Sequence, residues 1–370
     1  MTEGIIGLYR GFDSGKQFSM KAMGEFVSEA ASAAFAPRVV EECFDEPRLA
    51  MSRTGSGKLN KLFYNLDRYI LNGRPFADRE VDALIITDHS DGHVAFRSKA
   101  KHTIIICHDI LPKLLATGEI EGPKPTPLGE WLFSRNLEAM RRADLVICVS
   151  ENTRRELVER LGLPADRATT IHNPNLLVMN NSIFEGDVVR PELQSLIDGG
   201  RPIVLGVGGG KFQKNAKAFP EVLHRLSQDH GLDVGAAIVG RRDFPTTTVD
   251  DRLHFFSQVN GAELRLLYRS AAALYFPSLY EGFGLPIIEA QSLELPIVSS
   301  DRGSLPEVVG AGGKIVGAHD HDAAAQALAE IIRSPVTADA LRRAGAVNVN
   351  RFAPAPIRDR YISAFRTFAA

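Results

Sequence analysis

The chain has 370 residues, 44% of them hydrophobic, and a formal net charge of −2 at pH 7. The length exceeds the usual size of one hydrophobic core, so two domains are expected. The near-neutral charge argues against nucleic acid as a partner. Cys43, Cys107 and Cys148 are odd in number, which favours buried thiols in a reducing compartment. No window reaches bilayer length and no leader-like start is present, so the sequence predicts a cytoplasmic protein.

Short apolar runs alternate with longer amphipathic stretches along the chain, which is the rhythm of strand, helix and strand in a parallel sheet. Several runs are almost continuous in Val and Ile, which predicts burial on both faces of the sheet. The sequence therefore predicts an α/β fold. The expected strands are residues 4–9, 81–88, 103–109, 144–150, 168–173, 201–208, 234–240, 253–258, 273–278, 296–300 and 313–317.

The break between the two domains is expected in residues 175–200, where no clean periodicity exists and the segment ends in two glycines. We predict an N-terminal domain over residues 1–190 and a C-terminal domain over residues 191–355. A last amphipathic segment, residues 356–370, follows a loop that contains prolines.

Two N-terminal segments invite functional interpretations. Residues 52–74 combine Leu, Phe and Tyr at helical spacing with basic side chains, a pattern that can contact an anionic membrane or a lipid diphosphate, although most such segments are surface helices. His89, His93, His102 and His108 crowd one stretch. No metal-ligand spacing with Cys or Glu emerges among them, so we expect no metal site.

Residues 205–215, LGVGGGKFQKN, form a glycine-rich loop after a predicted strand. The spacing does not match the Walker phosphate loop, and a dinucleotide fingerprint would need glycine in place of Lys211. An anion cradle remains, in which Lys211 and Lys214 can neutralise a bound anion such as a diphosphate. Alternatively, either lysine is a surface residue. The glycines expected to line this cradle are Gly208, Gly209 and Gly210.

Residues 276–289, FPSLYEGFGLPIIE, place Glu281 and Glu289 around a turn that contains Gly282 and Gly284. The glycines leave the backbone open to a ligand, and the proline that follows suits the first turn of a helix. Unpaired N–H groups at a helix start can hold an anion, and carboxylates accept hydrogen bonds from sugar hydroxyls. The pattern fits a ligand with anionic and hydroxylated parts, such as a sugar nucleotide.

The Glu, seven residues, Glu arrangement inside FPSLYEGFGLP resembles the signature of the retaining glycosyltransferases of family 4. GAELRLLYRSAAALYFPS before it and PIVSSDRGSLPEVVGAGG after it follow in that family's order, and IIICHDILP and ADLVICVSENTRREL look like its N-terminal markers. The resemblance covers most of residues 80–330. It implies the GT-B architecture of two facing Rossmann-like domains with a cleft between them, and a closing helix at 356–370 that packs back onto the N-terminal domain.

The resemblance further implies retaining transfer of a hexosyl group of mannose or glucose type from a nucleoside diphosphate sugar, with GDP-mannose and UDP-hexoses as leading donors. The implied acceptor is a glycan or polyprenyl-linked sugar of a surface polysaccharide, held mainly by the N-terminal domain. No dedicated metal or cofactor is implied. Peripheral contact with the inner face of the membrane is compatible with this function.

Particular residues receive roles from the same resemblance. Glu289 would accept hydrogen bonds from the ribose hydroxyls, Glu281 would lie beside the transferred sugar, and Lys214 would meet the diphosphate. His108, at the end of the predicted strand 103–109, would lie near the reacting carbon. Further donor-side residues are Gly282, Phe283, Gly284 and Leu285, and acceptor-side residues are Gly11, Ser14, Gly15 and Asp109. Asp109 could instead cap the next turn.

Some alternatives stay open. A GT-B phosphorylase or a nucleotide-sugar epimerase would keep the fold but is disfavoured by the EGFGLP signature. A non-catalytic nucleotide-sugar-binding protein is disfavoured by Glu281, Lys214 and His108. Gly209 leaves that interpretation some room, because many family members have a basic or polar residue there, which Lys211 can compensate. In HDHD, residues 319–322, we expect Asp322 to be a helix N-cap rather than a metal ligand.

Overall fold

The computed structural model describes residues 5–11, 18–35, 39–43, 68–69, 76, 80–179, 188–240 and 251–368. The chain divides into two compact units by its internal contacts. The first comprises Met1–Glu119, Pro123–Asn173 and Ala355–Ala370, and the second comprises Ile120–Gly122 and Pro174–Pro354.

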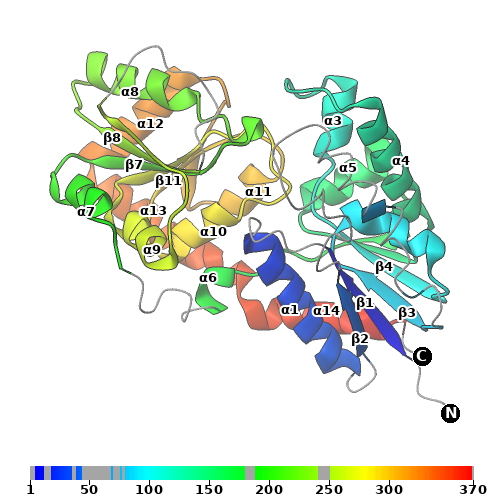
Figure 1. Cartoon of the computed structure of the whole chain (residues 1–370). Helices are drawn as coiled ribbons and strands as arrows, with labels where there is room; N and C mark the ends of the chain where they lie inside the picture. The colour runs from blue at the N-terminus through cyan, green and yellow to red at the C-terminus, as the bar shows by residue number, and fades with distance from the viewer. Residues whose placement is uncertain are drawn as a thin grey trace. The chain divides into compact units, whose positions relative to one another are not determined.

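The first unit is built on a six-stranded parallel sheet in the order β2-β1-β3-β4-β5-β6 (Figure 1). Its apolar runs are buried as predicted, and all four residues of β3 are inaccessible to solvent. The strands are β1 (Ile6–Arg10), β2 (Val39–Cys43), β3 (Ala83–Ile86), β4 (His102–Cys107), β5 (Leu145–Cys148) and β6 (Ala168–Thr170).

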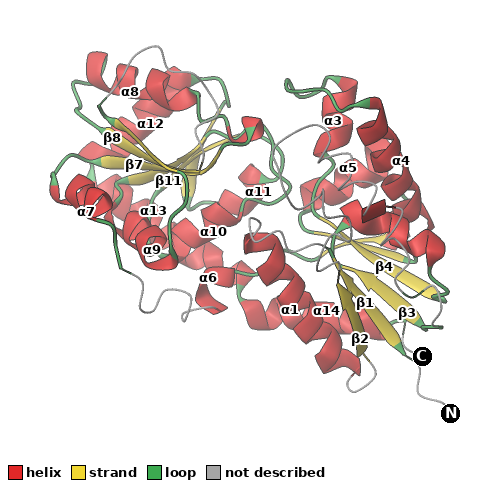
Figure 2. Ribbon diagram, viewed as in Figure 1, coloured by secondary structure: helices red, strands yellow, loops and turns green. Residues whose placement is uncertain are grey.

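Helices connect these strands, as expected for parallel neighbours (Figure 2). They are α1 (Phe18–Phe35), η3 (His89–Arg97), α3 (Leu111–Thr117), α4 (Pro127–Arg142), α5 (Glu151–Leu161), η4 (Ala165–Arg167) and α14 (Pro354–Arg366). The C-terminal helix α14 packs beside α1. The Tyr361 ring meets the Phe26 ring edge-on at 6.1 Å between centroids, and Arg358 pairs with Glu29 at 2.9 Å.

The second unit contains another six-stranded parallel sheet, in the order β12-β11-β10-β7-β8-β9. Its strands are β7 (Ile203–Gly209), β8 (Gly235–Gly240), β9 (Leu253–Phe256), β10 (Ala273–Phe276), β11 (Ile297–Ser300) and β12 (Gly313–Val316). Its helices are α6 (Leu176–Met179), α7 (Pro191–Asp198), η6 (Phe212–Lys214), α8 (Ala218–Gln228), α9 (Gly261–Ser270), α10 (Leu285–Ser292), α11 (Leu305–Val309), α12 (His321–Arg333), α13 (Pro335–Val349) and η7 (Asn350–Phe352).

The predicted α/β fold with two Rossmann-like halves is confirmed, with two differences in detail. Strand β2 was not expected, because VVEEC carries two glutamates and lacks a buried apolar run. The units part after Asn173, whereas the sequence placed the break after residue 190. Asn175 lies in the second unit because its backbone N–H donates to the Phe352 carbonyl at 2.9 Å and its amide to the Ile288 carbonyl at 3.4 Å.

Local capping explains one further correction. Helix α12 is capped by Asp320, whose carboxylate accepts the Ala323 N–H at 2.9 Å. Asp322, the expected cap, lies inside the first turn and instead pairs with Arg225 at 2.5 Å. Within the described residues, no helix is both long and apolar enough to cross a bilayer.

Candidate functional site

An ion pair connects the glycine loop after β7 with the turn after β10. The Lys214 Nζ lies 2.8 Å from the Glu281 Oε1, and the two side chains are only 16% and 13% exposed. Lys214 also lies over the Phe276 ring, 4.8 Å from its centroid. A cation held between a carboxylate and an aromatic face has little freedom, so its charge is fixed in space before any ligand arrives.

The backbone around Lys214 explains this placement. Gly208 has a φ of +99°, and a Cβ atom there would lie 2.9 Å from the Lys214 Cε, so glycine makes room for the lysine chain. Asn215 is buried in a left-handed conformation, and its amide reaches the carbonyls of Pro277 and Ala318 at 3.2 and 3.3 Å. The η6 turn is thereby tied to the segment that precedes Glu281.

The segment that follows β11 forms hydrogen bonds to the turn that contains Glu281. The Ser304 N–H donates to the Glu281 carbonyl at 3.1 Å, and the Ser304 hydroxyl lies 3.0 Å from that oxygen and 2.9 Å from the Phe283 carbonyl. Ser304 is fully buried. Sequence reasoning missed it, although it lies in the PIVSSDRGSLPEVVGAGG segment that carried the family resemblance.

Glu289 lies on α10, which begins after Gly284 at a φ of +99°. Its Oε2 accepts a hydrogen bond from the Tyr268 hydroxyl at 2.7 Å. Burial raises the pKa of Glu289, while the Tyr268 hydrogen bond and the nearby Lys214 charge act to lower it. Lys214 therefore acts electrostatically on both carboxylates of the signature.

The other predicted donor-side residues differ in their exposure and in what they can offer a ligand. Lys211 is exposed, and the loop leads into the η6 turn rather than directly into a helix. Gly209 ends β7 where the register with β8 shifts, and Gly210 has a φ of +95°. The Phe283 ring is buried edge-on against Phe352 at 5.5 Å, so the residue can offer a ligand its backbone but not its ring.

In the first unit, His108 follows the end of β4. Its Nε2 lies 2.9 Å from the Thr87 carbonyl, and its backbone N–H donates to the His89 Nδ1 at 3.3 Å. A carbonyl can only accept, so the Nε2 carries the proton and a neutral His108 keeps Nδ1 as an acceptor. The Asp109 carboxylate accepts the Leu111 N–H at 3.0 Å, which favours the alternative role of starting the next turn.

A polar cluster beside His108 was not anticipated. Burial raises the pKa of Asp88, but His89, His108, Arg68 and the Ser90 N–H outweigh it and lower the pKa to about 2. Asp88 is the last residue of the predicted strand 81–88, the position at which α/β sheets place functional side chains, and this was the signal available in the sequence.

Gly11, one of the expected acceptor-side residues, lies beside this cluster. A Cβ atom there would collide with the Oδ2 of Asp91. The Asp91 side chain has no solvent exposure and pairs with Arg68 at 2.6 Å. Ser14 and Gly15 lie outside the described residues, as does most of the segment 52–74.

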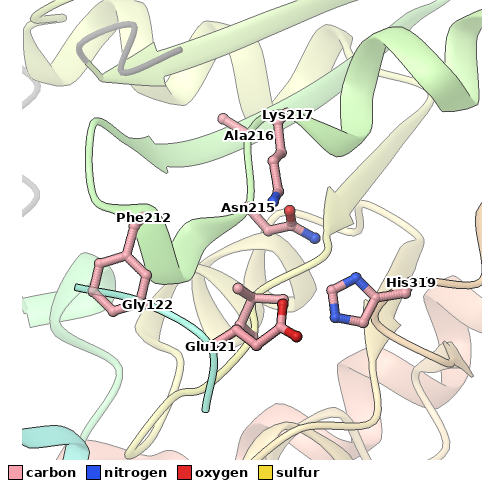
Figure 3. A pocket seen from close by; sticks show the side chains of 8 residues that line it. Glu121, Gly122, Phe212, Asn215, Ala216, Lys217 and His319 are labelled. Atoms are coloured by element: carbon pink, nitrogen blue, oxygen red, sulfur yellow. The ribbon is translucent and has the colours of Figure 1, made fainter. Parts of the chain in front are cut away.

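A pocket of about 360 Å³ lies next to the η6 turn in the second unit (Figure 3). Asn215, one of the residues that line this pocket, directly follows Lys214 at the end of the η6 turn. Within the described residues, no group of three or more His, Cys, Asp or Glu side chains is arranged to hold a metal. The pocket is lined by Glu121, Gly122, Phe212, Asn215, Ala216, Lys217, Leu279 and His319.

Two family models match the chain. The model described as Glycosyltransferase Family 4 matches residues 39–174, and the model described as Glycosyl transferases group 1 matches residues 192–347. The O-antigen chain mannosyltransferase B of Escherichia coli is 29% identical over 196 residues, which are 50% of this chain. The chain spans about half of that relative, 51% of its length.

Solved structures share the fold over nearly the whole chain. Sucrose-phosphate synthase from Thermosynechococcus elongatus has a TM-score of 0.73 at 18% identity and covers 98% of both chains. The Anabaena protein Alr3699/HepE in complex with UDP-glucose has a TM-score of 0.68 at 16% identity, covering 98% of this chain and 100% of that one.

Proposed function

We propose that this protein, a GT-B glycosyltransferase of group 1 by its family matches, transfers a hexosyl group from a nucleoside diphosphate sugar with retention of anomeric configuration. The observation that carries the proposal is the partly buried ion pair of Lys214 and Glu281 beside the carboxylate of Glu289. This arrangement sets one cation and two hydrogen-bond acceptors next to the start of a helix.

Lys214 is proposed to neutralise the diphosphate as it leaves. Negative charge grows on the leaving group during cleavage of the glycosidic bond, and a cation already fixed in place stabilises that charge without reorganisation. The exposed Lys211 would add a weaker, more distant charge. We also propose that no dedicated metal is needed, because Lys214 supplies the charge. Activity should then survive an excess of EDTA.

The two glutamates are proposed to bind the two hydroxylated parts of the donor, which are the ribose and the transferred sugar. Glu289 would accept the ribose hydroxyls, and Glu281 would orient the transferred sugar together with the N–H groups of Gly282 to Leu285. Since Glu281 is engaged by Lys214, it is better suited to positioning than to forming a covalent intermediate, in agreement with a single-site retaining reaction.

On the first unit, His108 is proposed to accept a hydroxyl of the transferred sugar through Nδ1, the ring nitrogen left available by the contact with Thr87. The Thr87 carbonyl and the His89 ring then hold this histidine in place. Gly11 and the residues that follow it would contribute to the acceptor side.

Donor and acceptor are proposed from the relatives. A mannosyltransferase of O-antigen chains and a fold neighbour bound to UDP-glucose suggest GDP-mannose or UDP-glucose as donor. A growing surface polysaccharide, as a glycan or polyprenyl-linked sugar, is the proposed acceptor. The enzyme would act in the cytoplasm, in peripheral contact with the membrane through residues 52–74. Flotation with anionic and with neutral lipid vesicles tests this contact, and equal recovery with both would contradict it.

The first experiment is a thermal-shift panel of GDP-mannose, UDP-glucose and ADP-glucose with their nucleoside diphosphates, because a ligand of the native state raises the melting temperature. We expect a shift with one base, lost in Glu289→Ala. NMR of the product formed from that donor then gives the anomeric configuration. A shift without turnover would indicate a binding protein, and no shift with any donor would contradict the proposed function.

A further inference from the structure

A buried tyrosine touches the carboxylate that is proposed to hold the ribose. Tyr268 lies near the end of α9, and its side chain is completely inaccessible to solvent. Its hydroxyl donates to the Glu289 Oε2 at 2.7 Å. Among the described residues, this is the single hydrogen bond that the Glu289 carboxylate accepts. The Oε1 is therefore left to a ligand.

We propose that Tyr268 is a positioning residue for nucleotide recognition, which fixes the rotamer of Glu289 so that its Oε1 meets the ribose hydroxyls. The proposal rests on the proposed function, because it assumes that Glu289 is the ribose acceptor. Tyr268 itself does not touch the donor. Its effect is transmitted through one hydrogen bond to a neighbouring helix.

The helix that carries Tyr268 is firmly anchored. Asn260 and Glu263 form a capping box at its start. Arg190 holds the same glutamate with its Nε at 2.6 Å and its Nη2 at 2.8 Å. With the N-terminus of α9 fixed in this way and the tyrosine ring buried, the hydroxyl cannot turn to another partner. The tyrosine thus imposes its geometry on Glu289 rather than following it.

The bond also bears on the charge of Glu289. A buried carboxylate tends to hold its proton, and a protonated one loses acceptor capacity for the two hydroxyls of a ribose. A donor to the ionised form opposes this tendency. The pKa of Glu289 is raised by burial, and the Tyr268 hydrogen bond is the largest effect in the opposite direction. Loss of the hydroxyl should raise this pKa further.

The test compares Tyr268→Phe with Tyr275→Phe. Tyr275 is a second buried tyrosine of the same unit, packed on the Phe219 ring, and no hydrogen bond joins it to Glu289 in the described part of the chain. The ligands are GDP, UDP and ADP with their 2′-deoxy and 3′-deoxy forms, titrated calorimetrically across a pH series. For the diphosphate that binds, we expect Tyr268→Phe to weaken the ribonucleotide about tenfold, the scale of one hydrogen bond to a charged group.

Two readouts separate positioning from a purely structural role. The pH below which binding is lost should move upward in Tyr268→Phe and stay in place in Tyr275→Phe. The preference for ribose over the deoxy forms should shrink in Tyr268→Phe alone. In a Glu289→Ala background, which has no acceptor for the Tyr268 hydroxyl, Tyr268→Phe should have no further effect on affinity, because coupled residues are not additive.

Each other result is decisive. If the wild type binds a diphosphate and both tyrosine variants keep its pH midpoint and ribose preference, the positioning role is wrong while the proposed function stands. If the wild type binds none of the diphosphates, both fail together. If Tyr268→Phe unfolds, the affinity of Tyr268→His in the same pH series replaces it, and an unchanged ribose preference would overturn the proposal.

Discussion

Gly303 and Glu281 are in backbone contact: a Cβ atom on Gly303 would collide with the Glu281 carbonyl oxygen, and Gly303 has a φ of +58°. The loop after β11 therefore packs directly against the backbone of the turn that contains Glu281. We predict that Gly303→Ala displaces this turn, weakens donor binding, and destabilises the protein by more than the roughly 1–2 kcal/mol of left-handed strain.

Gly231 provides the matched control, because it has a φ of +59° in the same unit and a Cβ atom added there would have no neighbour within 4 Å. Gly231→Ala should show the strain cost alone and leave donor affinity unchanged. Urea unfolding and donor titration of both variants provide the comparison. Equal losses of stability and equal affinities in the two would contradict the backbone coupling.

Because Lys214 is paired with Glu281 whereas Lys211 is exposed, we predict that substitutions of these two lysines of the glycine loop affect kcat to different extents. Lys214→Met should lower kcat by about a hundredfold or more, because it removes a fixed charge from the leaving group. Lys211→Met should have a much smaller effect, since the side chain is exposed. Steady-state kinetics with the donor from the thermal-shift panel decides this. Equal effects would assign the diphosphate to the loop as a whole.

The fold was largely predictable from the sequence because a buried parallel strand has a strong signature. The short apolar run 103–109 became β4, with the candidates His108 and Asp109 just beyond its carboxyl end, and the run 296–300 became β11. Strand β2 escaped because its two glutamates mask that signature. Asp320 and Asp322 show the limit of local rules, since the sequence predicted Asp322 as the cap and the structure has Asp320 in that position.

The contacts within the site could not be predicted in the same way. Lys214, Glu281 and Glu289 were identifiable from their motifs, but Ser304 and Tyr268 act through tertiary contacts that no spacing reveals. Gly208 was assigned to an anion cradle, and in the structure it also accommodates the Lys214 chain. Glycine at a strand end is compatible with either role, and only the side chain packed on it distinguishes them.

Glu263 gives a prediction for stability at acidic pH. The Arg190 hydrogen bonds lower the pKa of Glu263 to about 2 from its ordinary 4.5. A lowered carboxyl pKa contributes stability that is complete above pH 4.5 and is lost as the pH falls toward 2. Glu263→Gln should cost about 1–3 kcal/mol at neutral pH and flatten this dependence.

The exposed Arg225 and Asp322 pair serves as the control for this experiment. Asp322→Asn removes a surface ion pair and should change the free energy of unfolding much less than Glu263→Gln does. Chemical denaturation of both variants and the wild type at acidic and neutral pH gives the comparison. The same acid sensitivity in Glu263→Gln as in the wild type would show that this pair does not control it.

For Glu289 we predict a pH dependence of stability opposite to that of Glu263. Its pKa is raised above 4.5 by burial, so the native state holds the proton more tightly than the unfolded chain does. The stability that it contributes is complete below pH 4.5 and is lost as the pH rises through the raised pKa. Relative to the wild type, Glu289→Gln should therefore gain stability as the pH rises through this window.

The affinity for the donor should instead increase as the pH rises through the pKa of Glu289, because only the ionised carboxylate accepts both ribose hydroxyls. The same titration that weakens the fold would then create the binding site, a trade-off expected where a buried charge serves a ligand. Parallel pH series of urea unfolding and of nucleotide affinity test both halves. The two midpoints should coincide in the wild type, and both dependences should be absent in Glu289→Gln. Midpoints that differ would mean that another group controls nucleotide binding.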